Sequence, residues 1–217
     1  MTDWFTDELF NIPGATRISF PMSRLVVDPE RFLDDAQEVM AARGMGVVYT
    51  HTSCGEWLRP TPSAEERADL IERFYVPHHL AFTQAVDAVL ARLPACLIID
   101  CHSFPSVALP YEHATDAERP DICLGTNDFH TPEWLVQAAA EAFERAGLRI
   151  AVNHPFIGTF VPEKHCRKDP RVQSLMIEVN RRLYMDERTG ARLACFSEVQ
   201  GQVARVITAI SLSLRGV

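Results

Sequence analysis

The sequence predicts an α/β fold in which a sheet of mostly parallel strands is covered by helices on both faces. Short apolar runs typical of buried strands alternate along the chain with amphipathic segments typical of helices. Several of the strand candidates also end in polar residues, namely His102, Asn153 and Glu178. Polar residues at these positions are expected where an open α/β sheet binds ligands at the carboxyl ends of its strands.

The composition is that of an ordinary globular protein. The chain has 217 residues, of which 47% are hydrophobic and 23% charged, and a single domain spanning 1–217 is the simplest expectation. A net charge of −8 argues against a nucleic-acid partner, which would need a basic face. No apolar run approaches the ~20 residues needed to cross a bilayer, and no signal peptide is recognisable. Six scattered cysteines without a CxxC pair favour the reducing cytoplasm.

The predicted elements follow from periodicity and turn residues. We expect strands at 15–20, 46–50, 96–103, 122–125, 148–152 and 172–179, with strand 96–103 in the middle of the sheet. We expect helices at 3–10, from a capping box at 63–66 to about 75, from about 78 to 93 after Pro77, at 132–146 and at 197–214. The stretch 104–131 between them is long, irregular and rich in proline, as many functional loops are.

The strand candidate 96–103 ends abruptly in Asp100, His102 and Ser103. If the strand is buried, these residues lie at the edge of the sheet where ligands bind. The alternative is a capped strand end with a surface histidine.

Glu178 interrupts an otherwise apolar run at 172–179. A carboxylate in such a place is either buried with a partner or catalytic. We favour a general base that takes a proton from a metal-bound water.

The stretch 21–32 mixes Arg and Asp with apolar residues. Internal Arg–Asp pairing is one explanation, because an unpaired buried charge is costly. Binding of a substrate carboxylate by Arg24 or Arg31 is the other, and the forked guanidinium suits it.

Six stretches together resemble the N-formylglutamate amidohydrolase family. They are 2–10 (TDWFTDELF), 23–32 (SRLVVDPERF), 99–105 (IDCHSFP), 120–125 (PDICLG), 152–158 (VNHPFIG) and 177–187 (IEVNRRLYMDE). The resemblance covers nearly the whole chain in order. It implies a zinc-carboxypeptidase-like (phosphorylase/hydrolase-like) three-layer α/β/α fold with a mixed, mostly parallel central sheet. It also implies hydrolysis of N-formyl or other N-acyl amino acids, such as N-formylglutamate, to a free amino acid and a carboxylic acid.

The resemblance also implies roles for individual residues. His102 would bind a single Zn2+ ion, with Asp3 as a second ligand and Asp7 as a weaker candidate. Glu178 would be the catalytic base that passes a proton to the leaving amine. The residues implied in substrate binding are Arg31, Arg24, Asn153 and His154. Because His154 stands where the family often has Arg, specificity would differ if that Arg contacts substrate.

One departure from the family concerns the first zinc ligand. The usual Pro-His-Ser-Ser or Pro-His-Ser-Gly motif does not precede Thr2, although a catalytic zinc normally takes three protein ligands and a water. Either the start is internal, which we favour, or the chain is a short form with weak metal binding. The expected function is therefore a zinc-dependent cytoplasmic amidohydrolase with a small-molecule partner. The alternatives are a zinc deacylase or carboxypeptidase of other specificity, and an inactive homologue that binds carboxylates.

Overall fold

The computed structural model describes residues 2–112 and 118–213, and the chain divides into two compact units. Unit 1 consists of Ile18–Ala85 together with residues 2 and 109–112. Unit 2 consists of Asp3–Arg17, Val86–Ala108 and residues 118–213. Each unit has its own cluster of buried apolar side chains. The single domain 1–217 stays a prediction.

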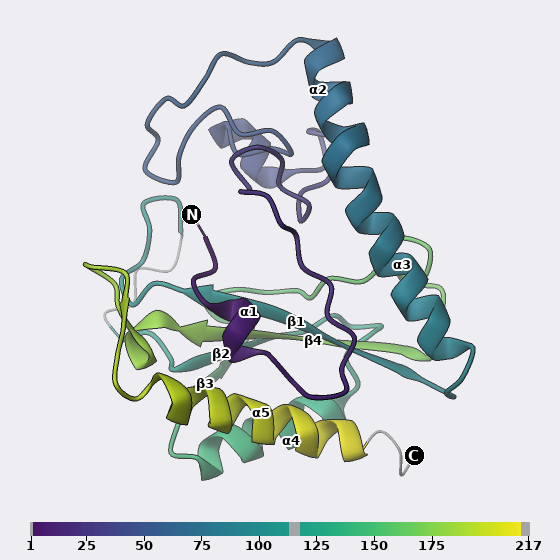
Figure 1. Ribbon diagram of the computed structural model, residues 1–217, viewed down its shortest axis with the longest axis vertical. Helices are drawn as coiled ribbons and strands as arrows, with labels where there is room; N and C mark the ends of the chain where they lie inside the picture. The colour runs from purple at the N-terminus through teal and green to yellow at the C-terminus, as the bar shows by residue number, and fades with distance from the viewer. Residues whose placement is uncertain (1, 113–117, 214–217) are drawn as a thin grey trace. The chain divides into compact units, whose positions relative to one another are not determined.

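Unit 2 is built on a four-stranded sheet with the order β1-β4-β2-β3 (Figure 1). The strands are β1 Cys96–Phe104, β2 Ile122–Gly125, β3 Ile150–Val152 and β4 Val172–Asn180. β1 is parallel to β4 and β2 is parallel to β3, whereas β2 and β4 are antiparallel. The predicted α/β class with a mixed, mostly parallel sheet is confirmed.

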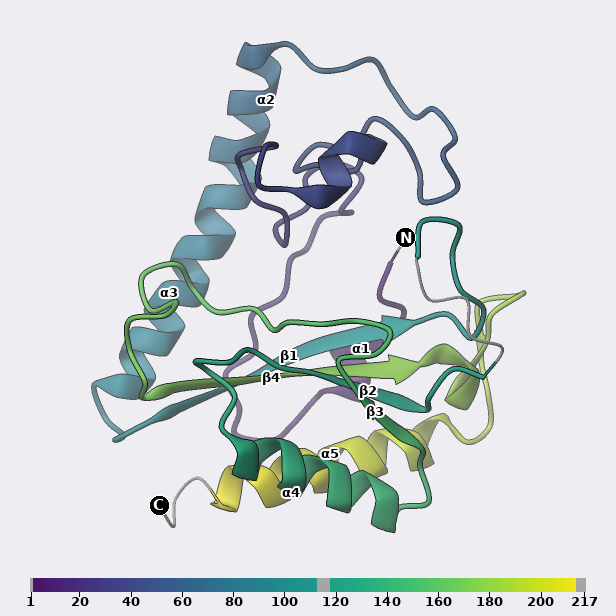
Figure 2. The same ribbon diagram turned by 180° about the vertical axis from the view of Figure 1, so that it is seen from behind.

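Helices α4 (Glu133–Arg145) and α5 (Phe196–Ser213) lie along the same face of this sheet (Figures 1 and 2). They pack on alternate strand residues, which include Leu124, Leu175 and Ile177. Since successive side chains of a strand point to opposite faces, the even-numbered residues of β1 and β4 lie on the other face. Cys123 and Gly125 of β2 lie there as well. One face of the sheet is therefore mostly apolar, and the other carries Asp100, His102, Ser174 and Glu178.

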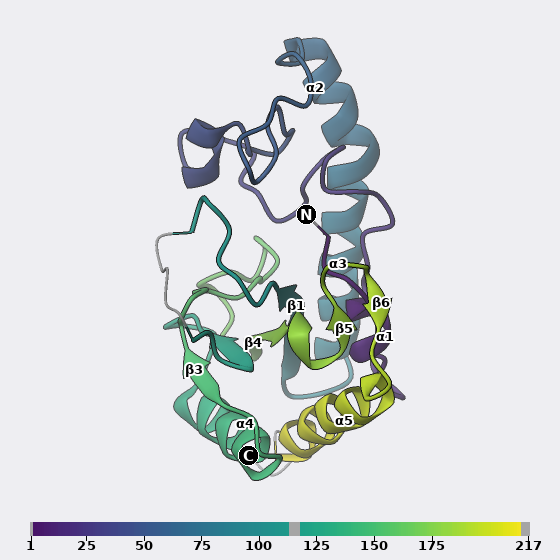
Figure 3. The same ribbon diagram turned by 90° about the vertical axis from the view of Figure 1, so that its left-hand side faces the viewer.

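The segment after β4 forms a short hairpin. It contains the 3-10 turn η3 Arg181–Leu183 and the antiparallel strands β5 Met185–Asp186 and β6 Ala191–Arg192. The hairpin lies beside helix α1 Thr6–Leu9, where Arg192 pairs with Glu8 (Figure 3).

β1 lies at one edge of the sheet formed by the described residues, so the prediction that it occupies the middle is wrong. Side chains take the place of a neighbouring strand at its carboxyl end. The Asp3 carboxylate accepts the Ser103 N–H (3.0 Å), and Arg181 donates to the Ser103 carbonyl (2.9 Å). These bonds satisfy backbone groups that a central strand would pair with a neighbour.

Unit 1 contains no named strand in its described residues. The predicted strands at 15–20 and 46–50 are wrong, and Val47 and Val48 pack on Val27 from irregular backbone. The 3-10 helix η1 (Val39–Arg43) precedes helix α2 Ala64–Leu70, which begins with the predicted capping box of Ser63 and Glu66.

The predicted break at Pro77 is also wrong. The π-helical turn η2 Ile71–Tyr75 leads directly into α3 Val76–Leu90. A π turn rearranges the hydrogen-bond ladder, so Pro77 can enter the helix although it lacks an N–H.

The irregular stretch 104–131 includes β2, and its residues 113–117 fall outside the described residues. Over 2–112 and 118–213, no helix combines the length and apolar character needed to cross a bilayer.

Candidate functional site

Three side chains form a row across the face of the unit 2 sheet opposite α4 and α5. His102 of β1 is the register partner of Glu178 of β4, and Glu178 is the register partner of Cys123 of β2. Register partners on neighbouring strands have side chains on the same face, with the strands roughly 4.8 Å apart. The predicted zinc ligand and the predicted base are therefore neighbours on adjacent strands. Glu178 is 8% exposed.

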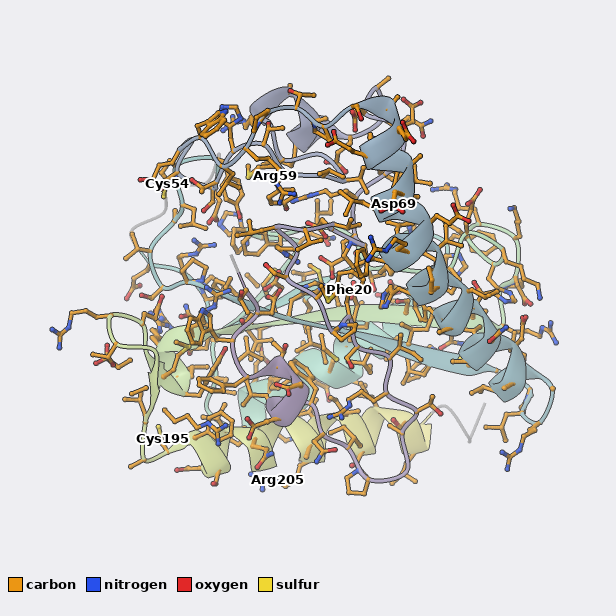
Figure 4. The ribbon with its side chains drawn as sticks, turned by 45° about the horizontal axis from the view of Figure 1, so that its top comes forward. Phe20, Cys54, Arg59, Asp69, Cys195 and Arg205 are labelled. Atoms are coloured by element: carbon orange, nitrogen blue, oxygen red, sulfur yellow. The ribbon has the colours of Figure 1, made fainter. Side chains whose placement is uncertain are left out.

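Cys123 is a packing residue of this row. Burial raises the pKa of its thiol to about 11, and the charge of Glu178 adds to the rise. The thiol donates to the Phe156 carbonyl at 3.3 Å and stays protonated near neutral pH, which excludes a nucleophilic thiolate. Of the six free cysteines, only Cys54 and Cys195 are exposed, and both are labelled in Figure 4.

The His102 ring is oriented by a carboxylate two residues earlier in β1. Its Nε2 lies 3.0 Å from Asp100 Oδ1, while Asp100 Oδ2 accepts the Phe160 N–H at 2.8 Å. A carboxylate only accepts hydrogen bonds, so Nε2 carries the ring proton in this contact. The Nδ1 atom of the neutral ring then presents a lone pair, and it lies 3.7 Å from Asp3 Oδ1.

Asp3 is held by a hydrogen-bond network from the end of the sheet. Its carboxylate accepts the Ser103 N–H, and the Arg181 guanidinium donates to both Ser103 Oγ (3.1 Å) and the Ser103 carbonyl. The Tyr184 hydroxyl donates to the Trp4 carbonyl at 2.8 Å. Burial raises the pKa of Tyr184 to about 12, so the hydroxyl remains a donor near neutral pH.

His102 Nδ1 and Asp3 Oδ1 have the chemistry that divalent ions such as zinc accept from proteins. Metal-bound histidines usually donate their second ring N–H to a carboxylate or carbonyl, as His102 does to Asp100. In the described part of unit 2, no third His, Cys, Asp or Glu side chain lies within 4.8 Å of both donors. Asp7 on the exposed side of α1 does not join them. The site fits a divalent ion through two protein donors.

The loop 153–160 packs on the same face as the row. Gly125 permits this approach, because a Cβ there would lie 2.2 Å from the Gly158 carbonyl oxygen. Ser174 of β4 bonds the Thr159 hydroxyl (2.6 Å) and donates to the Phe160 carbonyl (3.1 Å). These contacts place the Phe160 N–H against Asp100.

Asn153 and His154 begin this loop after β3. Asn153 accepts the Thr126 N–H (2.9 Å) and donates to the Thr126 hydroxyl (2.7 Å), so its amide connects the segments that follow β2 and β3. The His154 residue is exposed. Substrate binding by this pair stays a prediction.

Arg24 and Arg31 have carboxylate partners inside unit 1. Asp28 is fully buried, accepts the Tyr49 hydroxyl at 2.6 Å, and lies 3.4 Å from Arg31 Nε and 3.8 Å from Arg24 Nε. Arg24 also pairs with Glu30 (2.9 Å), and Arg31 lies 3.6 Å from a carboxylate oxygen of Glu38. Internal Arg–Asp pairing is therefore present, and substrate binding by these arginines stays a prediction.

A pocket of about 380 Å³ opens where β1 and β4 end. Its lining residues come from the segment before α1, from both strand ends and from the hairpin: Trp4, Pro105, Arg181, Met185, Glu187, Arg188, Thr189 and Gly190. None of the residues to which a role was assigned from the sequence lines this pocket.

Sequence reasoning does not single out Arg119, a charged residue that is only 4% exposed. It precedes β2 by three positions and stacks against Phe104 and Phe156. The signal in the sequence is weak, because a single Arg in an irregular stretch is usually solvated.

Comparison with known proteins finds one matching family and two similar solved structures. The family model described as N-formylglutamate amidohydrolase matches residues 1–185. The crystal structure of an N-formylglutamate amidohydrolase from Ralstonia eutropha JMP134 is similar, with a TM-score of 0.72 and 26% identity over 89% of this chain and 76% of that chain. A gene product of Agrobacterium tumefaciens shares the fold, with a TM-score of 0.57 and 18% identity over 88% and 69% of the two chains. The comparison with curated proteins finds no significant match.

Proposed function

Because the chain belongs to the N-formylglutamate amidohydrolase family, as its motifs predict, we propose that it is a metal-dependent hydrolase of N-acyl amino acids such as N-formylglutamate. One observation carries the proposal. His102, whose Nδ1 lies 3.7 Å from the Asp3 carboxylate, is the register partner of the buried Glu178. This arrangement supports the proposal, because the two residues proposed to bind the metal lie next to the residue proposed as the general base.

His102 Nδ1 and Asp3 would hold the ion, for which Zn2+ is the expected identity. When bound, such an ion polarises an amide carbonyl and lowers the pKa of a water molecule. Asp100 keeps the ring proton of His102 on Nε2, and the Ser103 N–H fixes the Asp3 carboxylate. The two contacts hold the His102 ring and the Asp3 carboxylate in place before an ion binds, so these side chains lose less freedom on binding.

Glu178 supplies the proton transfers. It takes a proton from the attacking water as the water oxygen bonds to the carbonyl carbon. It then gives that proton to the amine nitrogen as the C–N bond breaks. The products are a carboxylic acid, formic acid for an N-formyl substrate, and the free amino acid.

Arg31 and Arg24 are the first candidates to bind the substrate carboxylate, followed by Asn153 and His154. For the two arginines this role requires that the substrate carboxylate displace one of the carboxylates with which they pair inside unit 1. The proposed partner is a small molecule in the cytoplasm, with no nucleic-acid or membrane partner.

The decisive experiment combines metal analysis with a Glu178→Gln variant. We expect purified protein to hold zinc, and to release formate from N-formylglutamate in proportion to its zinc content. Glu178→Gln should lower kcat by about 10²–10⁴-fold without changing zinc content. Glu141→Gln, on the exposed surface of α4, is the matched control and should be unaffected. Full activity after metal removal, or with Gln at position 178, would refute the mechanism.

A second candidate function follows from the two-donor site. An inactive homologue would bind N-formylglutamate in a calorimetric titration, without turnover and without stoichiometric zinc. If N-formylglutamate is not hydrolysed but other N-acyl amino acids are, the protein is a deacylase of other specificity.

A further inference from the structure

Ser103, near the carboxyl end of the edge strand β1, has both of its backbone polar groups bonded by side chains. Its N–H donates to Asp3 Oδ1 at 3.0 Å, and its carbonyl accepts from Arg181 Nη2 at 2.9 Å. These partners lie 100 residues before Ser103 and 78 residues after it. The end of β1 is therefore joined both to the segment before α1 and to the residue that follows β4.

Arg181 holds Ser103 through two hydrogen bonds from one edge of its guanidinium. Nη2 donates to the Ser103 carbonyl, and Nε donates to Ser103 Oγ at 3.1 Å. The guanidinium is planar and its N–H groups have fixed directions, so two bonds from it set both the position and the orientation of the residue that accepts them. An ammonium group on a flexible stem provides no such constraint.

The oxygen of Asp3 that accepts the Ser103 N–H is also the one that faces His102. Asp3 Oδ1 lies 3.0 Å from the Ser103 nitrogen and 3.7 Å from His102 Nδ1. Nitrogen and oxygen donors about 2.0–2.2 Å from a tetrahedral zinc ion are about 3.4 Å apart. The observed separation is therefore close to the one that a shared ion needs, and it depends on where the Ser103 N–H points.

Tyr184 gives a second sign that these groups act together. Its hydroxyl donates to the carbonyl of Trp4, the residue after Asp3, at 2.8 Å. Burial raises the pKa of Tyr184, a hydrogen bond with Ser103 and the charge of Arg181 lower it, and the charge of Asp3 raises it. Arg181, Ser103 and Asp3 therefore surround one hydroxyl, which anchors the backbone next to Asp3.

We propose that Arg181 is a positioning residue, which fixes the Asp3 carboxylate opposite the His102 ring through its two bonds to Ser103. It holds the peptide group that donates to Asp3, so the carboxylate keeps its place before an ion binds. Support of this kind around a ligand raises metal affinity because less freedom is lost on binding. The inference rests on the proposed function, in which Asp3 and His102 would hold the ion.

Amide hydrogen exchange of metal-free protein tests the positioning without any ligand. We would compare the wild type with Arg181→Lys, which keeps the charge but loses the planar fork. The Ser103 amide should exchange about 5- to 10-fold faster in the variant, as expected for the loss of roughly one hydrogen bond. The Leu175 amide, in the core of the sheet, should stay within about twofold. Arg182→Lys is the matched control, because this neighbouring arginine also donates to a backbone carbonyl, and it should leave exchange at Ser103 unchanged.

Zinc affinity distinguishes positioning of Asp3 from simple capping of the strand. Outer partners of metal ligands typically account for about 10–100-fold in affinity, and Arg181 acts one contact further out, so we expect Arg181→Lys to raise the zinc Kd about 3- to 30-fold. Arg182→Lys should not change it. Unchanged exchange at Ser103, or an equal acceleration at Leu175, would overturn the inference. Faster exchange at Ser103 with an unchanged zinc Kd would overturn it as well, because Arg181 would then only cap β1.

The inference and the proposed function can fail separately. If the wild type binds no zinc and hydrolyses no N-acyl amino acid, the proposed function fails, while the exchange comparison still decides whether Arg181 positions Asp3. If a zinc-containing, active wild type and Arg181→Lys agree in exchange and in zinc Kd, the inference alone fails. If Arg181→Lys does not fold, Ser103→Ala removes the bond from Nε and keeps the bond from Nη2. The amide of residue 103 should then exchange about threefold faster after correction for intrinsic rates, and an unchanged rate would overturn the inference.

Discussion

Substitution of Asp100 tests whether the carboxylate sets the tautomer of His102. Asp100 accepts from two donors, His102 Nε2 at 3.0 Å and the Phe160 N–H at 2.8 Å. In Asp100→Asn the amide oxygen must take the Phe160 N–H, because the amide nitrogen cannot accept a hydrogen bond. The amide NH2 then faces His102 and favours the tautomer with the proton on Nδ1. That tautomer directs an N–H at Asp3 and has no lone pair for a metal.

The size of the effect follows from the contact. Loss of a carboxylate partner behind a metal-bound histidine typically weakens metal affinity by about 10–100-fold, or about 1.4–2.7 kcal/mol. A hydrogen bond to a charged group has a similar net value of about 1.5–3 kcal/mol. For Asp100→Ala we expect a loss of zinc affinity near the low end of this range, since the His102 ring can then adopt either tautomer. Asp100→Asn should lie near the high end because it favours the wrong one.

Two measurements check this prediction. Competition with a chromophoric chelator gives the zinc Kd, and ring 15N shifts of metal-free protein give the His102 tautomer. Asp121→Asn is the matched control, because the Asp121 side chain is 12% exposed, close to the 13% of Asp100, and pairs with arginines. An Nε2–H tautomer in Asp100→Asn together with an unchanged zinc Kd would refute the reasoning, and the tautomer result holds even for protein that binds no zinc.

Three further predictions concern stability. His130 is 1% exposed and both ring nitrogens bond backbone groups (2.7 and 2.8 Å), so His130→Ala should lose about 3 kcal/mol in urea unfolding; a loss below about 1 kcal/mol would contradict this account. A hydrogen bond from Arg171 lowers the pKa of Asp169 to about 2. The folded pKa lies below the unfolded value, so the stabilisation is complete above about pH 4 and is lost as the pH falls towards 2. The free energy of unfolding of Asp169→Asn should therefore be lower than that of the wild type at pH 5 and approach it near pH 2. A difference that stays constant over this pH range would contradict the prediction. Ile177→Ala on the α4–α5 face should cost about 2–4 kcal/mol with kcat of the folded protein unchanged, and a fall in kcat would argue against the separation of the two faces.

The strands of unit 2 could be predicted because they are short apolar runs between turn residues. Their order could not, because pairing depends on contacts between distant segments. β1 is an edge strand, and its Ser103 N–H is bonded by Asp3, 100 residues earlier. The apolar run at 46–50 has the composition of a strand. It folds as irregular backbone, since Val47 and Val48 are buried against Val27 rather than paired in a sheet.

Part of the candidate site can be predicted from the sequence for the same reason. His102 and Glu178 are polar residues in apolar strands, so each can be identified from its immediate neighbours. The orientation of His102 depends on Phe160, which is 60 residues from Asp100, and the position of Arg119 depends on a ring from the same loop. No local sequence pattern encodes where that loop packs, so its contacts with Asp100 and Arg119 cannot be predicted from the strand sequences.

The register between β1 and β4 connects the core to the chemistry. The two strands pair in parallel over nine positions, from Cys96 and Val172 to Phe104 and Asn180. A shift of one residue would turn Ile177 towards the polar face and Glu178 towards α4 and α5. The apolar side chains buried under those helices therefore oppose any such shift. The packing on one face of the sheet fixes which carboxylate stands beside His102 on the other.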